Sequence, residues 1–315
     1  MANLIANPRK WRNKALVLAT EATYALDAAP TGLLNWIEAR NVSLTPMDVD
    51  RAERNIDLPY MGTSGSVIVS TWAKLAFDIA IAPSGVVGTA PKWGALLMAC
   101  GLAETVTAAT SVAYNLVSNV FSSATAYMVI DGTLHKLLGM RGEVKAKMSA
   151  KGLPMLSFAF DACYVTPVTG AMPTVDRTGW TLEEAINSVN TGPVNIGGVP
   201  LSFSEFDWAL GNKIARMDNP GPQREILITD RKPTASITVL APDLATFNPF
   251  ALNDSGATLD LTVMHGTVAG KKLKTEMKVR ITGVEYSQIE EMVGYKLTLE
   301  PLPVNGNDEI ALTCM

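Results

Sequence analysis

The sequence has few charged residues, and this shortage excludes several classes of protein. Of its 315 residues, 18% are Asp, Glu, Lys or Arg, whereas an average soluble domain has about 25%. The 26 basic and 30 acidic residues leave a net charge of -4, which argues against a protein that grips nucleic acid through its phosphates. The 48% of apolar residues excludes a disordered chain. A mean hydropathy of +0.17 indicates apolar surface that other subunits cover.

Long hydrophobic runs and paired cysteines are missing as well. The most apolar stretch, residues 75–102, is broken by Asp78, Pro83 and Lys92, so no span of about 20 apolar residues predicts a transmembrane helix. The start, Met1–Arg12, carries its basic residues after a short apolar run, unlike a secretory signal. The three cysteines are far apart and are expected to be buried thiols in a reducing compartment, which predicts synthesis in the cytoplasm: Cys100, Cys163 and Cys314.

Side chains that carry catalysis or bind metals are scarce and scattered. The two histidines, His135 and His265, are about 130 residues apart and have no carboxylate at a metal-ligand spacing. A turn at a hairpin tip is the predicted place of His265. Gly62–Gly65 lacks the spacing of a nucleophile elbow, and Gly139–Gly142 lacks the Lys of a phosphate-binding loop. Both glycine pairs are therefore predicted to form turns.

Adjacent carboxylates and one basic stretch are the remaining candidates. Glu183–Glu184 and Glu290–Glu291 are predicted to lie in solvated turns, because a glycosidase needs two carboxyl groups that face one sugar. The basic residues Lys272, Lys274, Lys278 and Arg280 alternate along one strand face, but Glu276 interrupts them and no aromatic residue lies between them. A solvated sheet face is favoured over a nucleic-acid site. We therefore predict a protein that is not an enzyme, with no catalytic, cofactor-binding or metal-binding residues and no cofactor.

Alternation with a period of two recurs along the chain and predicts half-buried strands. In residues 273–281, the side chains of Leu273, Met277 and Val279 share one face, whereas Lys274 and Glu276 lie on the other. The same reasoning predicts strands at residues 15–19, 37–44, 73–81, 125–130, 143–148, 156–164, 200–209, 225–229, 235–240, 258–264, 273–281 and 295–300.

Helical patterns are few. Pro91 suits a first helical position, and the spacing of Trp93, Leu96, Leu97 and Cys100 predicts a helix that packs on a sheet and ends at Gly101. A shorter helix is predicted from Asp243 to Phe247, and residues 181–186 are expected to form one or two further turns.

The two ends of the chain contain similar segments in the same order. An alternating strand closes with Ala-Pro at Ala82–Pro83 and again at Ala241–Pro242. Later come Ile130–Leu134 and Met264–Val268, each followed by an alternating basic strand. We therefore predict a duplicated β domain: a first domain at residues 1–167, an irregular linker at 168–198, which is rich in Pro, Gly, Thr and Asn, and a second domain at 199–315.

The ordered series of segments resembles the tail tube (major tail) proteins of long-tailed bacteriophages, particularly those with non-contractile tails. The resemblance covers about residues 35–301 and rests on Trp93–Gly101, Ala124–Gly132, Gly139–Val144, Lys151–Phe160, Tyr164, Gly211–Asn212 and Ile228–Pro233. It implies a mainly β fold with two similar β-sandwich or rolled-barrel domains, each flanked by a helix. The implied function is structural: a virion protein that polymerises into stacked rings, which form the tail tube and the channel for genome ejection.

The resemblance also implies partners. Six such domains pool their inner sheets into one barrel, so two domains per chain favour three chains per ring, with six chains as the alternative. Ring-to-ring contacts are expected from residues 47–66 and from the N-terminal arm. A tape-measure protein and terminator or tip proteins are the expected end partners, DNA passes without specific binding, and no membrane is involved. The competing readings are a tail-tip or terminator ring protein of the same fold and a β-sandwich binding module.

Overall fold

The computed structural model describes residues 8–315, and residues 1–7 of the expected N-terminal arm lie outside them. The fold is mainly β, as predicted, and every strand pairing in the described part is antiparallel. The first-half strands are β1 (Lys14–Thr20), β2 (Trp36–Ile37), β3 (Arg40–Glu53), β4 (Ser66–Ala80), β5 (Leu102–Thr107), β6 (Ser111–Leu116), β7 (Ala124–Ile130), β8 (Thr133–Ser149), β9 (Met155–Tyr164) and β10 (Val168–Thr169).

The second half continues with β11 (Val194–Ile196), β12 (Val199–Leu201), β13 (Phe203–Ala209), β14 (Asn212–Asp218), β15 (Arg224–Arg231), β16 (Thr234–Leu240), β17 (Thr258–His265), β18 (Leu273–Ile289), β19 (Met292–Pro301) and β20 (Ile310–Cys314). The three short helices are α1 (Gly32–Asn35), α2 (Gly94–Ala99) and α3 (Pro249–Ser255). Within residues 8–315, no helix has the length and apolar character needed to cross a membrane.

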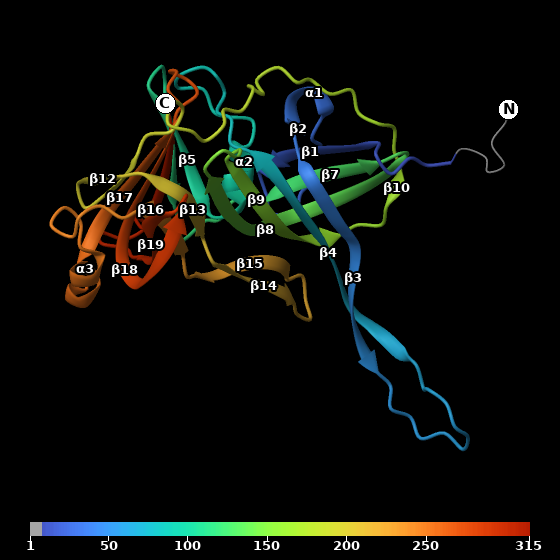
Figure 1. Ribbon diagram of the computed structural model, residues 1–315. Helices are drawn as coiled ribbons and strands as arrows, with labels where there is room; N and C mark the ends of the chain where they lie inside the picture. The colour runs from blue at the N-terminus through green and yellow to red at the C-terminus, as the bar shows by residue number, and fades with distance from the viewer. Residues whose placement is uncertain (1–7) are drawn as a thin grey trace.

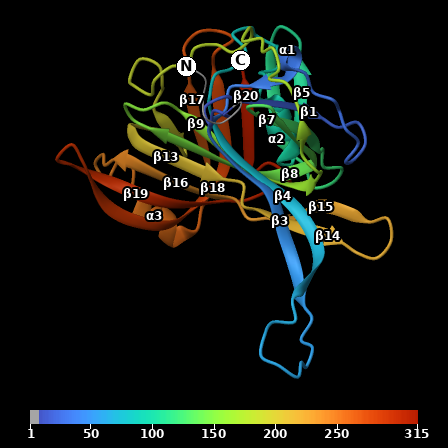
Figure 2. The same ribbon diagram turned by 90° about the vertical axis from the view of Figure 1, so that its right-hand side faces the viewer.

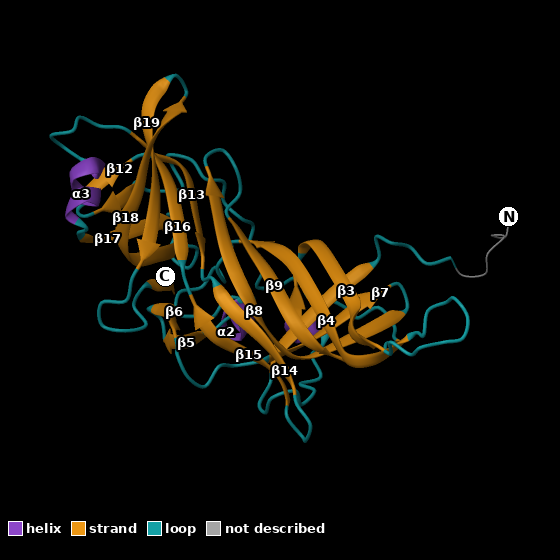
Figure 3. Ribbon diagram, turned by 90° about the horizontal axis from the view of Figure 1, so that it is seen from below, coloured by secondary structure: helices purple, strands orange, loops and turns teal. Residues whose placement is uncertain are grey.

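One continuous sheet runs through both halves of the chain. Neighbouring strands follow the order β3-β4-β9-β8-β13-β16-β19-β18, so a first group of four is followed by a second group with the same succession of connections. Figure 3 shows these strands side by side, from β16 and β13 through β8 and β9 to β4 and β3. We call this assembly the main sheet.

The long strand β8 joins the two groups. Its first part pairs with β7, and its last residues, Lys145–Ser149, pair with Glu205–Ala209 of β13 on the same edge. Strand β9 lies along the opposite edge of β8. Most of the remaining strands form the second layer: β1, β2 and β7 behind the first group, and β5, β6, β11, β12, β17 and β20 behind the second. The short β10 pairs with the start of β8, and β14 and β15 form a separate two-stranded sheet.

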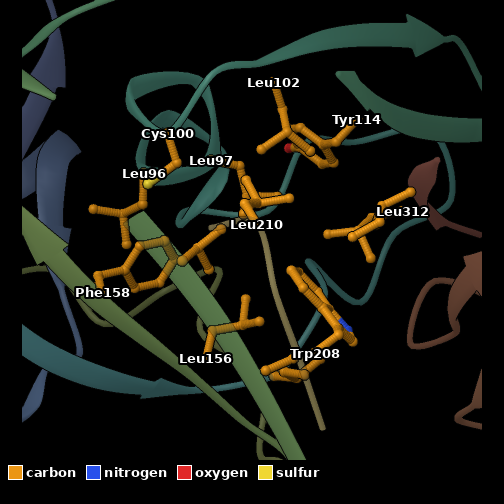
Figure 4. Packing of buried hydrophobic residues seen from close by; sticks show 14 of the residues in the cluster. Leu96, Leu97, Cys100, Leu102, Tyr114, Leu156, Phe158, Trp208, Leu210 and Leu312 are labelled. Atoms are coloured by element: carbon orange, nitrogen blue, oxygen red, sulfur yellow. The ribbon is translucent and has the colours of Figure 1, made fainter. Parts of the chain in front are cut away.

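Period-two alternation places one face of each main-sheet strand in the core. Phe158 and Leu156 of β9 are buried, and so are Phe206 and Trp208 of β13. All belong to a single hydrophobic cluster that spans both halves. Figure 4 shows Trp208 and Leu210 packed among side chains from the first half. The two halves therefore share one core.

The helices differ from the prediction: α2 is shorter than expected, and α3 lies elsewhere. The expected stripe of α2 is confirmed, because Trp93, Leu96, Leu97 and Cys100 are fully buried, and the indole N–H of Trp93 donates to the carbonyl of Ala82 at 2.9 Å. The helix expected at 243–247 is wrong in place: α3 begins at Pro249, with Asn248 as its N-cap. A proline suits the first turn, where its missing N–H has no helical partner to lose.

Several predicted turns and loops are strands. Gly139–Gly142 lies inside β8, where the pairing with β9 shifts register, rather than in a turn. Residues 47–53 belong to β3 and residue 66 begins β4, so the loop is confined to residues 54–65 at the tip of a hairpin. We call the part of this hairpin at residues 46–71 the arm, as distinct from the N-terminal arm. It projects away from the body in Figures 1 and 2. Residues 181–186 contain no helix.

Candidate assembly surfaces

The sequence candidates for chemistry do not converge on one site. Gly62–Gly65 lies in the loop at the tip of the arm, as predicted for a turn. Glu183 is half-buried and forms an ion pair with Arg40, so it is not solvated. Glu290 turns between β18 and β19 and pairs with Lys151 at 2.5 Å. Among residues 8–315, no group of three His, Cys, Asp or Glu side chains is arranged to hold a metal ion.

His265 is a core residue rather than the tip of a hairpin. It ends β17, is 2% exposed, and its Nδ1 lies 2.8 Å from the hydroxyl of Thr191. Burial lowers the pKa of His265, and the nearby Glu184 carboxylate opposes this shift. His135 in β8 also has a pKa lowered by burial. Both imidazoles are therefore favoured in the neutral form when the chain is folded.

A pH dependence of stability follows. The folded-state pKa of His265 lies below the unfolded value of about 6.5. The contribution of neutral His265 to the free energy of unfolding is complete above the unfolded pKa. It is lost as the pH falls through the folded pKa, because the unfolded chain binds the proton at a higher pH than the folded chain. We expect His265→Asn to show a shallower loss of unfolding free energy between about pH 7 and pH 5, measured by urea denaturation. An unchanged slope would contradict this assignment, and His135→Asn reports the share of the second histidine.

The main sheet ends in two unpaired edges. Strand β3 pairs only with β4 in the described part of the chain. In β18, residues 273–280 pair with β17 on one edge, and residues 281–289 have no partner on that same edge. The unpaired part of β18 corresponds to the last part of β8. On one edge of β8, β7 pairs with the first residues and β13 pairs with the last ones. On the same edge of β18, β17 takes the place of β7, and the place of β13 is empty in the described part of the chain. Free edges of this kind are templates for pairing with another chain.

Apolar side chains lie beside both edges. On β3, Val42 and Leu44 are partly buried against the core, as is Val284 on β18. Tyr286 is 70% exposed and forms an aromatic cluster with Phe250 and Tyr295, with ring centroids 5.7–5.8 Å apart. An exposed aromatic patch next to an open edge is typical of a subunit interface.

The hairpin of β14 and β15, from the second half, covers an apolar surface of the first half. It leaves the main sheet at Gly211, whose φ of 66° is unfavourable for other residues, and it crosses β4, β8 and β9. Ile214 and Ile226 pack against Trp72, Cys163 and Leu138. This hairpin, visible along the lower side of the body in Figure 1, joins the halves through side-chain contacts outside the shared core.

Charged groups fix this hairpin. Arg141 is buried and donates to the carboxylate of Glu225 and to the carbonyl of Ile226, each at 2.7 Å. Arg216 donates to Asp161 at 2.7 Å and to Asp48 at 2.9 Å. Charge-assisted hydrogen bonds of this kind are the strong ones.

The face of the main sheet that points away from the core is polar. Lys74 pairs with Asp48 at 2.8 Å, and Lys296 lies 3.8 Å from Glu285. Lys145 and Lys147 are exposed and form no ion pair in the described part of the chain, although Lys147 lies opposite Asp207 in register. The small neighbours on this face are Ala76, Ser157, Ala159, Ser236, Thr238 and Thr298. Part of its positive charge is thus balanced by carboxylates.

Two residues of the basic stretch, Lys274 and Lys278, form ion pairs. Lys274 forms an ion pair with Glu276 at 2.6 Å, and Lys278 forms one with Asp260 at 2.5 Å. The Asp260 side chain raises the pKa of Lys278, first through its hydrogen bond and then through its charge. These two ion pairs, one within β18 and one across to β17, therefore offset part of the charge of the basic stretch.

These surfaces define a β-sheet subunit that is completed by copies of itself rather than by a small ligand. The family model described as phage tail tube protein matches residues 11–313, so the chain belongs to the phage tail tube protein family. It is a structural, non-enzymatic component of the virion tail and self-associates into a tube. No curated protein matches the chain. The predicted family and structural role are confirmed, and the tail-tip, terminator and binding-module alternatives are not favoured.

Sequence reasoning missed several of the elements that form these surfaces. Strands β5, β6, β14 and β20 were not expected, nor was the reach of β3 and β4 into the arm. One signal for the arm was available: Ser66–Ser70 contains three consecutive β-branched residues, which favour a strand. The free edge of β18 has no sequence signal, because it depends on where β17 ends.

Proposed function

We propose that three copies of this chain close into a ring in which β3 of one chain pairs with residues 281–289 of β18 in the next. The observation that carries the proposal is the pairing of β13 with β8, which makes the same connection inside one chain. With four main-sheet strands in each half, three chains supply six groups. Repeating one connection around a closed ring leaves no free edge.

The polar face of the main sheet then lines the channel. Its Ser, Thr and Ala side chains and the ion pairs of Lys74 and Lys296 support this assignment, since each free Lys or Arg adds salt-dependent affinity for phosphate. DNA passes such a wall without specific binding. Lys274 and Lys278 of β18 are in ion pairs, which supports weak binding of phosphate by this strand as well.

Rings stack through the loop 54–65 at the tip of the arm, together with the N-terminal arm, of which residues 1–7 lie outside the described part. Tyr60 and Met61 in this loop are exposed, which supports a contact with another subunit. Stacking of this kind is heterologous and open-ended, so it builds a tube.

The remaining parts of the proposal rest on the sequence. The two domains at 1–167 and 199–315, with a linker at 168–198, rest on the repeated segments and on the repeated strand order. The long non-contractile tail type, the tape-measure protein and the terminator or tip partners rest on the family resemblance. Three buried free thiols support synthesis in the reducing cytoplasm of the host.

Electron microscopy and native mass measurement of the purified protein across a concentration series test the ring. We expect particles of three times the chain mass of 33.6 kDa, which stack into hollow tubes of uniform width as the concentration rises. Top views with six similar lobes support three chains of two domains each. Rings of six chains, or compact rings that never stack, would overturn this proposal.

A further inference from the structure

A groove of about 440 Å³ lies between the end of β19 and the base of the β14–β15 hairpin, and it is bordered on the first half by Gly101, Ser118 and Phe121. Its lining includes Lys232, Pro233, Glu300 and Leu302. The ion pair between Arg231 and Glu309, at 2.6 Å, holds one wall. Nothing in residues 8–315 fills this groove.

The two halves have equivalent surfaces at this point of the main sheet. In the first half the β14–β15 hairpin covers this surface, and in the second half the groove lies there. In the first half, the covered surface is the end of β9 with Thr71 and Trp72 of β4. In the second half, the groove is formed by the end of β19 with Lys232 and Pro233, which lead into β16. Strands β9 and β19 hold the same position in the repeated order of the main sheet.

The charged residues under the two surfaces also correspond. Arg141 lies opposite Asp161 in the pairing of β8 with β9, and Arg280 lies opposite Glu300 in the pairing of β18 with β19. Arg141 is satisfied by the hairpin that covers it. Arg280 has no salt bridge in the described part of the chain. Its buried Nε, which lacks a hydrogen-bond partner, lies beside Gly256 and not among the groove-lining residues, so only the terminal guanidinium nitrogens correspond to the Arg141 atom that binds the hairpin.

The arm resembles the hairpin that fills the first surface. In β14 the residues Ile214, Arg216 and Asp218 alternate, and in β3 the residues Val49, Arg51 and Glu53 do the same. Arg216 faces Ile226 in its hairpin, and Arg51 faces Ile68 in the arm. Arg51 has no ion pair among residues 8–315, whereas Arg216 binds Asp161.

We infer that the groove is the docking site for the arm of a second copy of this chain. Arg51 of the arm pairs with Glu300, as Arg216 pairs with Asp161, and Ile68 packs against Leu302 and Pro233. The carbonyls of the arm strand accept from Arg280, as the carbonyl of Ile226 accepts from Arg141. The inference rests on the proposed three-chain ring, because β3 of the neighbour must lie beside β18 for its arm to reach the groove.

Disulfide trapping tests the contact. The variant carrying Ile68→Cys and Leu302→Cys is first assembled under reducing conditions and its native mass is measured, then it is oxidised and run on a denaturing gel. We expect a covalent species of three chains and none larger, with no such species from either single variant. The three native cysteines are buried, so they are not expected to compete.

The two measurements separate the failures. Three-chain particles without a covalent trimer would overturn the arm site and leave the ring standing. Covalent species longer than three chains would place the arm on another ring and overturn the inference. Absence of three-chain particles under reducing conditions would overturn the ring and the inference with it.

Charge exchange provides a second test that does not depend on thiol geometry. Arg51→Glu and Glu300→Arg are each expected to weaken ring assembly at least about tenfold, because like charges then meet in the groove. The variant with both changes is expected to recover most of this loss. Arg54→Glu, three residues further along in the tip loop, is the matched control and should leave the three-chain ring intact. Failure of the double variant to recover would contradict the pairing.

Discussion

Tyr286→Lys is expected to leave a folded monomer that no longer forms rings. The side chain is 70% exposed in the single chain, so the substitution changes the free energy of unfolding by less than about 0.5 kcal/mol. In the proposed ring, the same side chain lies beside β3 of the next chain, where an ammonium group becomes buried without a partner. Each such contact is expected to lose at least about 2 kcal/mol, or about 30-fold in affinity.

The measurement is the native mass across a concentration series, with circular dichroism as the check on folding. Tyr60→Lys is the matched control, because Tyr60 is 68% exposed and lies in the tip loop, away from the edge of β18. It is expected to retain the three-chain ring and to lose stacking. Rings of normal affinity from Tyr286→Lys would show that the edge of β18 is not an interface.

Trp208→Ala is expected to destabilise the whole chain. Trp208 lies on β13 at the junction of the halves and is 3% exposed, among side chains of both halves in Figure 4. Removing a buried indole leaves a cavity and costs about 3–5 kcal/mol. Because the two halves share one hydrophobic cluster, we expect a single unfolding transition at lower urea concentration.

Trp208→Phe keeps most of the volume and is expected to lose less than half as much. The readout is the urea midpoint followed by tryptophan fluorescence and by circular dichroism in parallel. Two separate transitions in the variant, with the first half unchanged, would contradict the shared core and favour halves that are stable on their own.

The period-two pattern predicted the mainly β fold because each main-sheet strand has one buried face. Residues 156–164 and 235–240 alternate cleanly and fall within β9 and β16. Strand lengths were underestimated wherever both faces are exposed: β3 beyond Thr45 has no buried residue, so nothing in its hydrophobic pattern distinguishes an arm from a loop. Gly139 in β8 was read as a turn because glycine often marks one, whereas here its positive φ of 60° accompanies a shift in strand register.

The assembly surfaces could be predicted only in part. The excess of apolar residues indicated surface to be covered, and it includes Tyr286, Met292 and Val293 around the edge of β18. Which residues meet depends on tertiary geometry. Arg51 and Glu300 are far apart in the sequence, and their correspondence to Arg216 and Asp161 is visible only once the strand order is known.

The connection between β8 and β13 changes how much order must be gained during assembly. In a ring of three chains, half of the contacts between neighbouring domains already exist in the folded monomer. The two domains that each of these contacts joins therefore lose no further translational or rotational freedom when the ring forms. Only three bodies, rather than six, must then be brought together, and each association of free bodies costs on the order of 4–15 kcal/mol. Because each pair of domains belongs to one chain, two kinds of junction alternate around the ring. The junctions at Trp208 lie within a chain and are part of its hydrophobic core, whereas the junctions at Tyr286 form only between two chains. A ring pulled apart by force therefore opens at the Tyr286 junctions.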